Sequence, residues 1–338
     1  MKAFSSFTVI VTAGSSLIAG ETTWEGFSPQ LSTNSQIIWQ IPTNSLPTSF
    51  WIYRRHGPRI FLATVISNAI TLASLQSKGF PQPSAKDFFI WEDRGPNYPG
   101  MVPSVFSIRP GYATMCYWMP HSDTGSGTGI PSDATIVRRA WDEASRLGVD
   151  PKQLKLKNLT SHFCSADEKG RNIINRLCGR GVFLSRQLDG ILFFGSGDDG
   201  WNEGFWIEFG SQGHIRAFSL NWPNLERCKT HQTASPKQIM DCIWAQKVMV
   251  LPNDDEPNYF ARVKHLAKAK NLTIGRITPY YGEGVFGETP RDDVPPEFMT
   301  PIAELEAVAN FGNSNDTLRI ISPILSSEVI RLLQNKAR

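Results

Sequence analysis

The feature that most constrains this sequence is a plan that occurs twice: a strand-like run ending in Trp and Pro, followed by a Ser-capped helical segment with a second Trp. The strand-like runs are MCYWMP and FSLNWP. Three positions of the first helical segment recur 103 positions later (235 − 132): Ser132, Ile136 and Trp141 correspond to Ser235, Ile239 and Trp244. Constant spacing of this kind indicates an internal duplication. Two unrelated helices that each bury a Trp are the alternative.

The duplication predicts the fold class, an α+β protein of two related lobes, each a helix packed on an antiparallel β-sheet. A chain of 338 residues with 41% hydrophobic residues has room for two cores. The expected parts are 1–20 as a signal peptide, 21–50 as an extended lead-in, 51–125 as a helix and strands completing the first lobe, 126–225 as the first repeat module, 226–325 as the second, and 326–338 as a C-terminal helix.

The first residues, MKAFSSFTVIVTAGSSLIAGE, hold one Lys and then an apolar, small-residue stretch of signal-peptide length. They predict an exported protein, whether periplasmic, envelope-bound or extracellular; a buried N-terminal strand is the alternative. The second apolar run, 60–75, contains Ser67, Asn68 and Thr71 and falls short of the ~20 residues that span a bilayer. We therefore expect a buried helix there and no transmembrane span in the mature chain.

Local patterns predict several elements of secondary structure. A helix is expected over 59–76, because Gly79 and two prolines follow it. Alternating apolar residues predict strands at 88–93 and 105–118 and a sheet over 181–223. The segment ELEAVANFGNSNDTLRIISPIL is typical of a hairpin that turns at GNSND, and Ser132 is placed as a helix N-cap.

Charge favours no nucleic-acid partner. The net charge is +3, and the locally basic stretch 152–186 carries eight Lys or Arg against Asp167 and Glu168. No nucleic-acid-binding motif accompanies these charges, so a solvated linker and helix face is the favoured interpretation.

Five cysteines form no metal-binding spacing, and neither a metal nor a cofactor is expected. In an exported protein the pairs Cys164/Cys178 and Cys228/Cys242 could form disulfides that leave Cys116 free; buried thiols are the alternative. The six His residues are scattered singly, with no hydrolase motif around them, so the sequence offers no catalytic residue.

Two segments place aromatic residues beside acids in predicted turns and are the candidate binding surfaces. The first is the tip of a hairpin and the second is a Tyr-Tyr-Gly-Glu turn. Their candidate residues are Asp198, Asp199, Trp201, Asn202, Tyr280, Tyr281 and Glu283. Oxygen ligands on the hairpin tip could hold Ca²⁺, but the spacing is not that of an EF-hand, and a solvated tip is favoured.

The strand pair that leads into FSLNWP shows the pattern G-x-I-x-x-F-x-x-x-W, formed by Gly213, Ile215, Phe218 and Trp222. With the order of elements around it, this pattern resembles PepSY-type modules over about 130–325. The run Pro301, Glu304, Leu305, Ala307, Val308 and Ala309 is similar to one near the end of uncharacterised exported bacterial proteins. The resemblance implies an exported, non-enzymatic protein that binds or restrains other proteins, sometimes peptidases, and it implies no site residues.

The first functional hypothesis is therefore an exported, non-enzymatic binding or regulatory protein, with a protein or peptide partner favoured over a small molecule. The alternative is a carbohydrate-active enzyme or lectin that uses the aromatic and acidic hairpin around Asp198 to Glu208. An enzyme should gather carboxylates and aromatic residues into one concave pocket. A third class, a structural envelope component, should expose a broad apolar patch.

Overall fold

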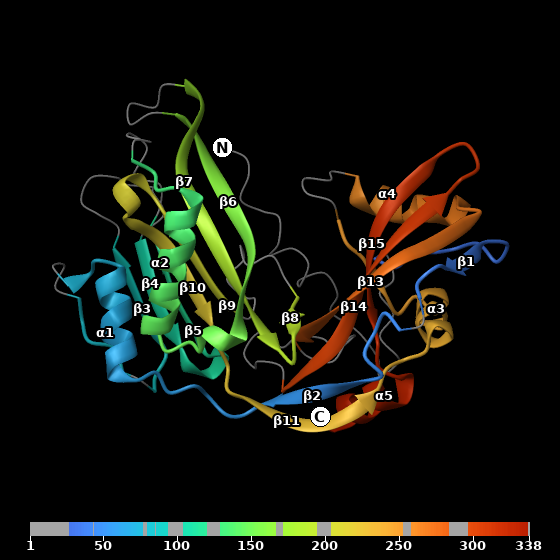
Figure 1. Ribbon diagram of the computed structural model, residues 1–338, viewed down its shortest axis with the longest axis horizontal. Coiled ribbons are helices and arrows are strands. Elements are labelled where there is room, and N and C mark those ends of the chain that lie inside the picture. Colours follow the sequence, from blue (N-terminus) through green and yellow to red (C-terminus); the bar gives the residue numbers. More distant parts are fainter. Residues whose placement is uncertain are drawn as a thin grey trace. The chain divides into compact units, whose positions relative to one another are not determined.

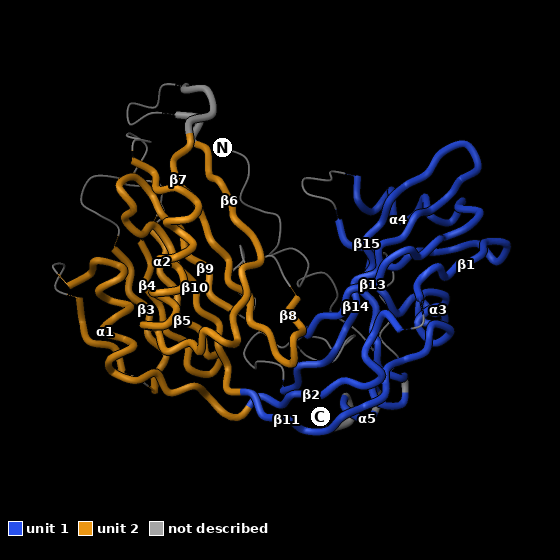
Figure 2. Tube along the Cα trace, in the orientation of Figure 1, with its two compact units in different colours: residues 1–55, 225–338 blue, residues 56–224 orange. Residues whose placement is uncertain are grey.

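The computed structural model describes residues 27–42, 44–76, 80–84, 86–93, 104–119, 129–166, 172–194, 204–252, 258–283 and 297–336. The chain forms two compact units, coloured separately in Figure 2. Unit 2 is His56–Asn224, and unit 1 combines Met1–Arg55 with Leu225–Arg338. Unit 2 is thus an insertion in the sequence of unit 1.

Unit 2 is built on an antiparallel sheet. Its strands run in the order β3-β4-β5-β10-β9-β7-β6, and the short β8 pairs with the end of β7. The strands are β3 (Phe89–Asp93), β4 (Ser104–Arg109), β5 (Thr114–Trp118), β6 (Leu154–Ala166), β7 (Asn172–Leu188), β8 (Ile191–Phe193), β9 (Gly204–Phe209) and β10 (Ile215–Asn221).

Two helices, α1 (Ala63–Leu72) and α2 (Asp133–Arg146), cover one face of this sheet (Figure 1). Side chains alternate between the two faces of a strand. In β9, Phe205, Ile207 and Phe209 therefore join the core under the helices, while Glu208 lies on the other face. Three fully buried residues of α2, spaced four apart, meet them: Ile136, Ala140 and Ala144.

Among the residues that the structure describes, unit 1 contains a mixed sheet and three α-helices. The strands are β1 (Gln36–Trp39), β2 (Ser49–Arg55), β11 (Leu225–Gln232), β12 (Met249–Val250), β13 (Asn271–Glu283), β14 (Phe298–Asn310) and β15 (Asn315–Pro323). Antiparallel pairs join β13 to β14, β14 to β15 and β2, β15 to β12, and β2 to β11, whereas β1 runs parallel to β13. The helices are α3 (Pro236–Trp244), α4 (Tyr259–His265) and α5 (Ser327–Lys336).

A small core anchors the C-terminal helix of unit 1. Leu333 of α5 is buried with Leu325, with Ile52 of β2 and with Phe298 at the start of β14. Val329 of α5 packs against the same cluster. The helix expected over 326–338 is therefore present, and its apolar stripe fixes it to strands that lie far away in the sequence.

The expectation of two related lobes, each a helix on an antiparallel sheet, is wrong. Strands dominate the described residues, with fifteen strands and five α-helices. Unit 2 places two helices on one sheet, and the sheet of unit 1 is mixed. The two Trp-bearing helices also sit in unlike surroundings, since Trp141 is partly buried against the core whereas Trp244 is 42% exposed. In the second copy, strand β11 separates the FSLNWP run, which closes β10 of unit 2, from helix α3 of unit 1, so the repeated plan does not correspond to one structural module.

Some of the other local predictions are confirmed and others are wrong. The predicted helix at 59–76, the strands at 88–93 and 105–118, and the hairpin turning at GNSND are confirmed by α1, β3, β4, β5, β14 and β15. The basic stretch 152–186 is not a linker with a helix, since most of it lies in the β6–β7 hairpin. The lead-in 21–50 contains β1 and the start of β2, because its Gln-Ile-Ile-Trp run pairs with β13.

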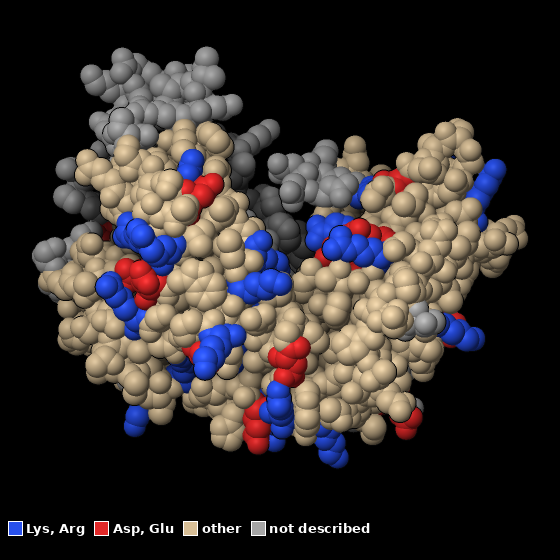
Figure 3. All heavy atoms as spheres, in the orientation of Figure 1, with Lys and Arg blue, Asp and Glu red and all other residues tan. Residues whose placement is uncertain are grey.

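Charges of both signs are interspersed over the visible face of the molecule (Figure 3). This distribution fits the small net charge of +3, and it differs from the single-sign stripe that marks a nucleic-acid surface. None of the helices that the structure describes has the length and apolar character to cross a bilayer.

Candidate functional site

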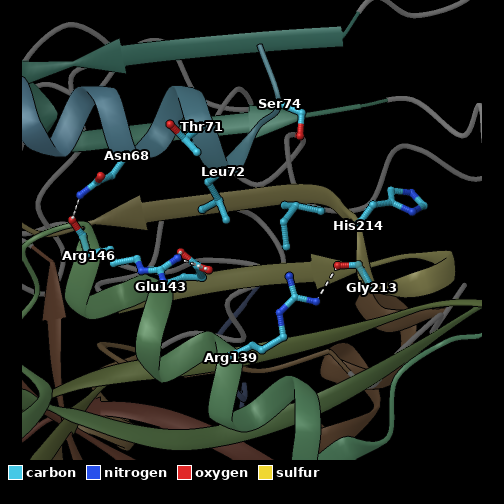
Figure 4. Close-up of a pocket in the computed structure, with 10 residues that line it drawn as sticks. Asn68, Thr71, Leu72, Ser74, Arg139, Glu143, Arg146, Gly213 and His214 are labelled. Atoms are coloured by element: carbon cyan, nitrogen blue, oxygen red, sulfur yellow. Dashed lines mark hydrogen bonds and ion pairs between the residues drawn. The ribbon is translucent and has the colours of Figure 1, made fainter. Parts of the chain in front are cut away.

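A pocket of about 370 Å³ opens in unit 2 beside α1 and α2, next to the turn between β9 and β10 (Figure 4). We call it the helix-side pocket. The turn is the short 3-10 segment Ser211–Gly213. The residues that line the pocket come from these three places: Asn68, Thr71, Leu72, Ser74, Arg139, Glu143, Arg146, Gly213, His214 and Ile215.

The periodicity of α2 places three charged residues on the pocket side. Arg139, Glu143 and Arg146 are four and three residues apart, and such positions neighbour one another on a helix surface. The hydrophobic face of the same helix is buried on the sheet, so this charged face points to the pocket rim. The repeated plan assigned no role to these residues, although their spacing on one helix face is visible in the sequence.

Arg139 is held by two contacts. Its Nη1 donates a hydrogen bond of 2.6 Å to the carbonyl oxygen of Gly213 (Figure 4), and its guanidinium carbon lies 4.7 Å from the centroid of the Phe209 ring. Gly213 has a φ of +73°, and a Cβ added there would lie 2.5 Å from Arg139 Nη1. Glycine therefore provides both the turn conformation and the space for the guanidinium.

The other end of the pocket is closed by an ion pair and an interhelical bond. Arg146 Nη1 lies 3.2 Å from Glu143 Oε1, and Asn68 Nδ2 of α1 donates to the carbonyl oxygen of Arg146 at 2.8 Å. At the Arg139 end, His214 Nδ1 lies 2.5 Å from the carbonyl oxygen of Ser211. Two guanidinium groups against one carboxylate make the lining cationic, and the hydroxyls of Thr71 and Ser74 add neutral hydrogen-bonding groups.

A buried ion pair occupies the opposite face of the same sheet. Glu208 Oε1 of β9 lies 2.8 Å from Arg216 Nη1 of β10, and the two side chains are only 8% and 3% exposed. Glu208 Oε2 is 3.9 Å from Nε2 of His162, which lies 3.3 Å from Thr160 Oγ1. This group is distinct from the helix-side pocket, and its single carboxylate is neutralised by Arg216.

Glycine in β7 makes room for that ion pair. A Cβ added at Gly179 would lie 2.7 Å from Glu208 Oε1 and 2.8 Å from Arg216 Nη1. A Cβ at Gly181, two residues on and thus on the same face, would collide with Thr160 Oγ1. The Gly-Arg-Gly run inside a strand was the sequence signal of a close approach, and it was overlooked.

The structure describes only the second of the two candidate surfaces from the sequence. Asp198, Asp199, Trp201 and Asn202 lie outside the described residues, so the hairpin tip stays a prediction.

The second candidate surface, at 280–283, is not a turn. Tyr280, Tyr281 and Glu283 belong to β13, where they pair with β14, and the side chain of Glu283 lies outside the described part. Tyr281 is 1% exposed and packs edge-on against Tyr53 with ring centroids 5.2 Å apart. Burial raises the pKa of Tyr280, and the charge of Glu304 raises it further. Exposure at 281 was therefore wrongly expected, because the strand continues through the Tyr-Tyr pair.

The cysteines divide into two states. Cys116, Cys228 and Cys242 are free, so the Cys228/Cys242 disulfide is excluded in this structure. Cys178 is disulfide-bonded; the side chain of Cys164 lies outside the described residues, so the Cys164/Cys178 pairing stays a prediction. Among the described residues, no three His, Cys, Asp or Glu side chains gather into a metal-binding group.

No protein-family model matches the chain, and no curated protein matches it. Eight chains of solved structures do match. One is an uncharacterized protein from Eubacterium rectale ATCC 33656, whose crystal structure is 11% identical in sequence, with a TM-score of 0.43 and with 87% of this chain and 88% of that chain covered. A likeness at this TM-score carries no inference about function.

Proposed function

We propose that the protein is an exported, non-enzymatic binding or regulatory protein whose helix-side pocket takes a carboxylate of a protein or peptide partner. The proposal combines the N-terminal sequence, which has the pattern of an export signal, with the chemistry of the pocket. The observation that carries it is the fixed guanidinium of Arg139 at the pocket wall.

Arg139 is suited to recognise a carboxylate because its orientation is set before any ligand arrives. One guanidinium nitrogen, Nη1, donates to the carbonyl oxygen of Gly213, and the guanidinium lies over the Phe209 ring. These two contacts together do not use all five N–H groups of the guanidinium. A planar guanidinium pairs with a carboxylate through two parallel hydrogen bonds. A side chain already held in place loses less conformational entropy on binding, which strengthens the interaction.

The size and composition of the pocket support a side chain or a chain end as ligand. Its volume of about 370 Å³ lies near the lower end of the range for small-molecule sites. Arg146 adds positive charge, while Glu143, already paired with Arg146, would repel a second carboxylate from that end. The ligand carboxylate is therefore expected at the Arg139 end, beside Gly213 and His214.

The test uses short peptides in matched pairs, in which Asp and Glu in one member are replaced by Asn and Gln in the other. Binding of labelled peptides to the whole protein is measured by fluorescence anisotropy. We expect acidic peptides to bind and Arg139→Met to weaken them at least tenfold, about 1.4 kcal/mol. Raising the salt concentration should weaken binding as well, because the interaction is ionic.

Arg138→Met is the matched control, since Arg138 lies next to Arg139 on α2, is exposed and carries the same charge. It should leave binding within about twofold of wild type. Equal binding of the acidic and amide peptides, or equal losses in the two variants, would show that the Arg139 end of the pocket is not the recognition site.

Export is tested separately by expressing the full chain in a bacterial host. The intact mass of the protein recovered outside the cytoplasm should lack about 20 N-terminal residues. Recovery of full-length protein from the cytoplasm alone would contradict export, and it would leave the peptide test unaffected.

A further inference from the structure

Strand β6 lies at an edge of the unit 2 sheet. Within the described part of the chain it is hydrogen-bonded to β7 and to no other strand. The outward backbone N–H and C=O groups of such a strand form a template onto which another extended chain can add. The pairing with β7 is regular from Asn158 to His162, between two register shifts, so this stretch offers an even row of backbone groups.

Exposed apolar side chains flank that row. Leu156, Leu159 and Phe163 are 39%, 40% and 60% exposed. An edge strand of unit 1 differs, since β11 exposes mainly Glu, Arg, Lys and Thr side chains. Natural edge strands are usually protected by charges of this kind. The β6 edge instead has apolar groups on which the side chains of an added strand could pack.

The positive charge of strands β6 and β7 favours a partner segment with negative charge. Strands β6 and β7 contain no Asp or Glu, and β6 carries Lys155 and Lys157 beside the apolar row. Acidic side chains on an added strand would face these ammonium groups, whereas a basic strand would be repelled. The exposed Leu residues fit apolar side chains of a peptide better than the phosphates and sugars of a nucleic acid.

We infer that the edge of β6 captures an extended acidic segment of a partner protein by strand addition along Asn158–His162. Backbone hydrogen bonds provide the affinity, Leu159 and Phe163 receive alternate apolar side chains, and Lys155 and Lys157 select acidic ones. This surface does not include the helix-side pocket, so the inference is independent of the proposed carboxylate site.

The probe is a labelled, capped peptide of alternating Val and Glu, added to the whole protein and followed by fluorescence anisotropy. A second peptide of the same sequence is N-methylated at alternate residues, which removes backbone donors from one edge and keeps the charge. We expect the first peptide to bind and the N-methylated one to bind at least tenfold more weakly. The variant K155E/K157E should weaken the first peptide at least tenfold.

The control variant K264E/K268E makes the same charge change at two exposed lysines of unit 1 and should leave binding within twofold. All of these measurements are made in the Arg139→Met background, so that binding of the acidic probe at the helix-side pocket does not contribute. Equal binding of the two peptides, equal losses in the two charge variants, or tighter binding of an oligothymidylate than of the peptide would overturn the inference. Concentration-dependent self-association that excludes the peptide would also overturn it, since a second copy would then cover β6.

Discussion

Helices α2 of unit 2 and α3 of unit 1 begin with the same Ser and carry a Trp at the same distance from it, yet they pack differently. The helix α2 buries Ile136, Ala140 and Ala144 completely on its sheet, and Trp141 packs against the same core. The shorter α3 buries Ile239, Cys242 and Ile243, while its Trp244 is 42% exposed. The shared local pattern thus begins a helix at both places, but the segments that each helix packs against decide which of its side chains contribute to stability.

The same contrast holds for two ion pairs between neighbouring strands. Glu208 and Arg216 join β9 to β10 in unit 2 with almost no exposure. Arg276 and Glu306 join β13 to β14 in unit 1 at 3.1 Å, but their side chains are 68% and 47% exposed. Losing one partner of a buried pair leaves a charge without compensation in a medium of low dielectric constant, whereas water solvates the partner left at a surface.

The largest expected effect comes from breaking the buried pair. Arg216→Met should lower the free energy of unfolding by about 3–5 kcal/mol, because Glu208 would remain buried without its partner. Arg276→Met should cost at most about 1 kcal/mol, because the Glu306 carboxylate that it leaves is exposed to water. Urea denaturation followed by tryptophan fluorescence measures both. A similar loss in the two variants would mean that burial does not distinguish the pairs.

The next effect concerns the two tryptophans. Trp141→Ala should cost about 2 kcal/mol, since it removes an indole packed against the core of unit 2. Trp244→Ala should cost less, about 1 kcal/mol, because 42% of this residue is already exposed to water. Thermal denaturation of the two variants provides the comparison, and a larger loss at 244 would contradict the packing described for α3.

The alkylation rates of the two free cysteines of unit 1, Cys228 and Cys242, depend on how α3 packs. Burial raises the pKa of the Cys242 thiol, an effect that Lys247 partly offsets and Asp241 reinforces. A higher pKa leaves less thiolate at pH 8, and the thiolate is the reactive form. Cys228 is exposed on β11, so iodoacetamide should alkylate it at least tenfold faster, as measured by peptide mass spectrometry. Protection of both thiols from alkylation would instead indicate the disulfide that the structure excludes.

Local chemistry accounts for what the sequence predicted correctly. The hairpin turning at GNSND depends on its turn residues, and the helix α1 depends on the spacing of its apolar residues, all within a dozen residues. The architecture depends on contacts that no local pattern encodes. Strand β1 pairs with β13 across more than 200 residues, and β2 pairs with both β11 and β14. The insertion of unit 2 within unit 1 was therefore not visible in the repeated plan.

The candidate site shows the same limit. The spacing of Arg139, Glu143 and Arg146 on one helix face was readable, but the role of Gly213 was not. Only the fold brings that turn to α2, where Gly213 accepts the hydrogen bond of Arg139. The prediction that Tyr281 lies in a turn was wrong for a related reason, because an aromatic residue near a Gly-Glu pair fits a turn as well as a strand. Its burial follows from the long pairing of β13 with β14.

The smallest expected effect separates the two helix starts. In α3, Ser235 Oγ accepts a hydrogen bond of 3.3 Å from the backbone N–H of Gln238, and Gln238 Oε1 accepts one of 2.8 Å from the N–H of Ser235. In α2, Ser132 occupies the N-cap position, as the sequence predicts, but its Oγ contacts the Thr135 hydroxyl and makes no capping bond to the backbone.

Ser235→Ala should therefore cost about 1 kcal/mol, the usual loss of a side-chain cap, and Ser132→Ala only a few tenths. The start of α2 has a different anchor, since Asp133 pairs with Arg180 of β7 at 2.7 Å and stands at the positive end of the helix dipole. Chemical denaturation of the two Ala variants tests this difference. An equal loss in both would mean that Ser132 caps α2 in solution, and the two helix starts would then share the chemistry that their sequences share.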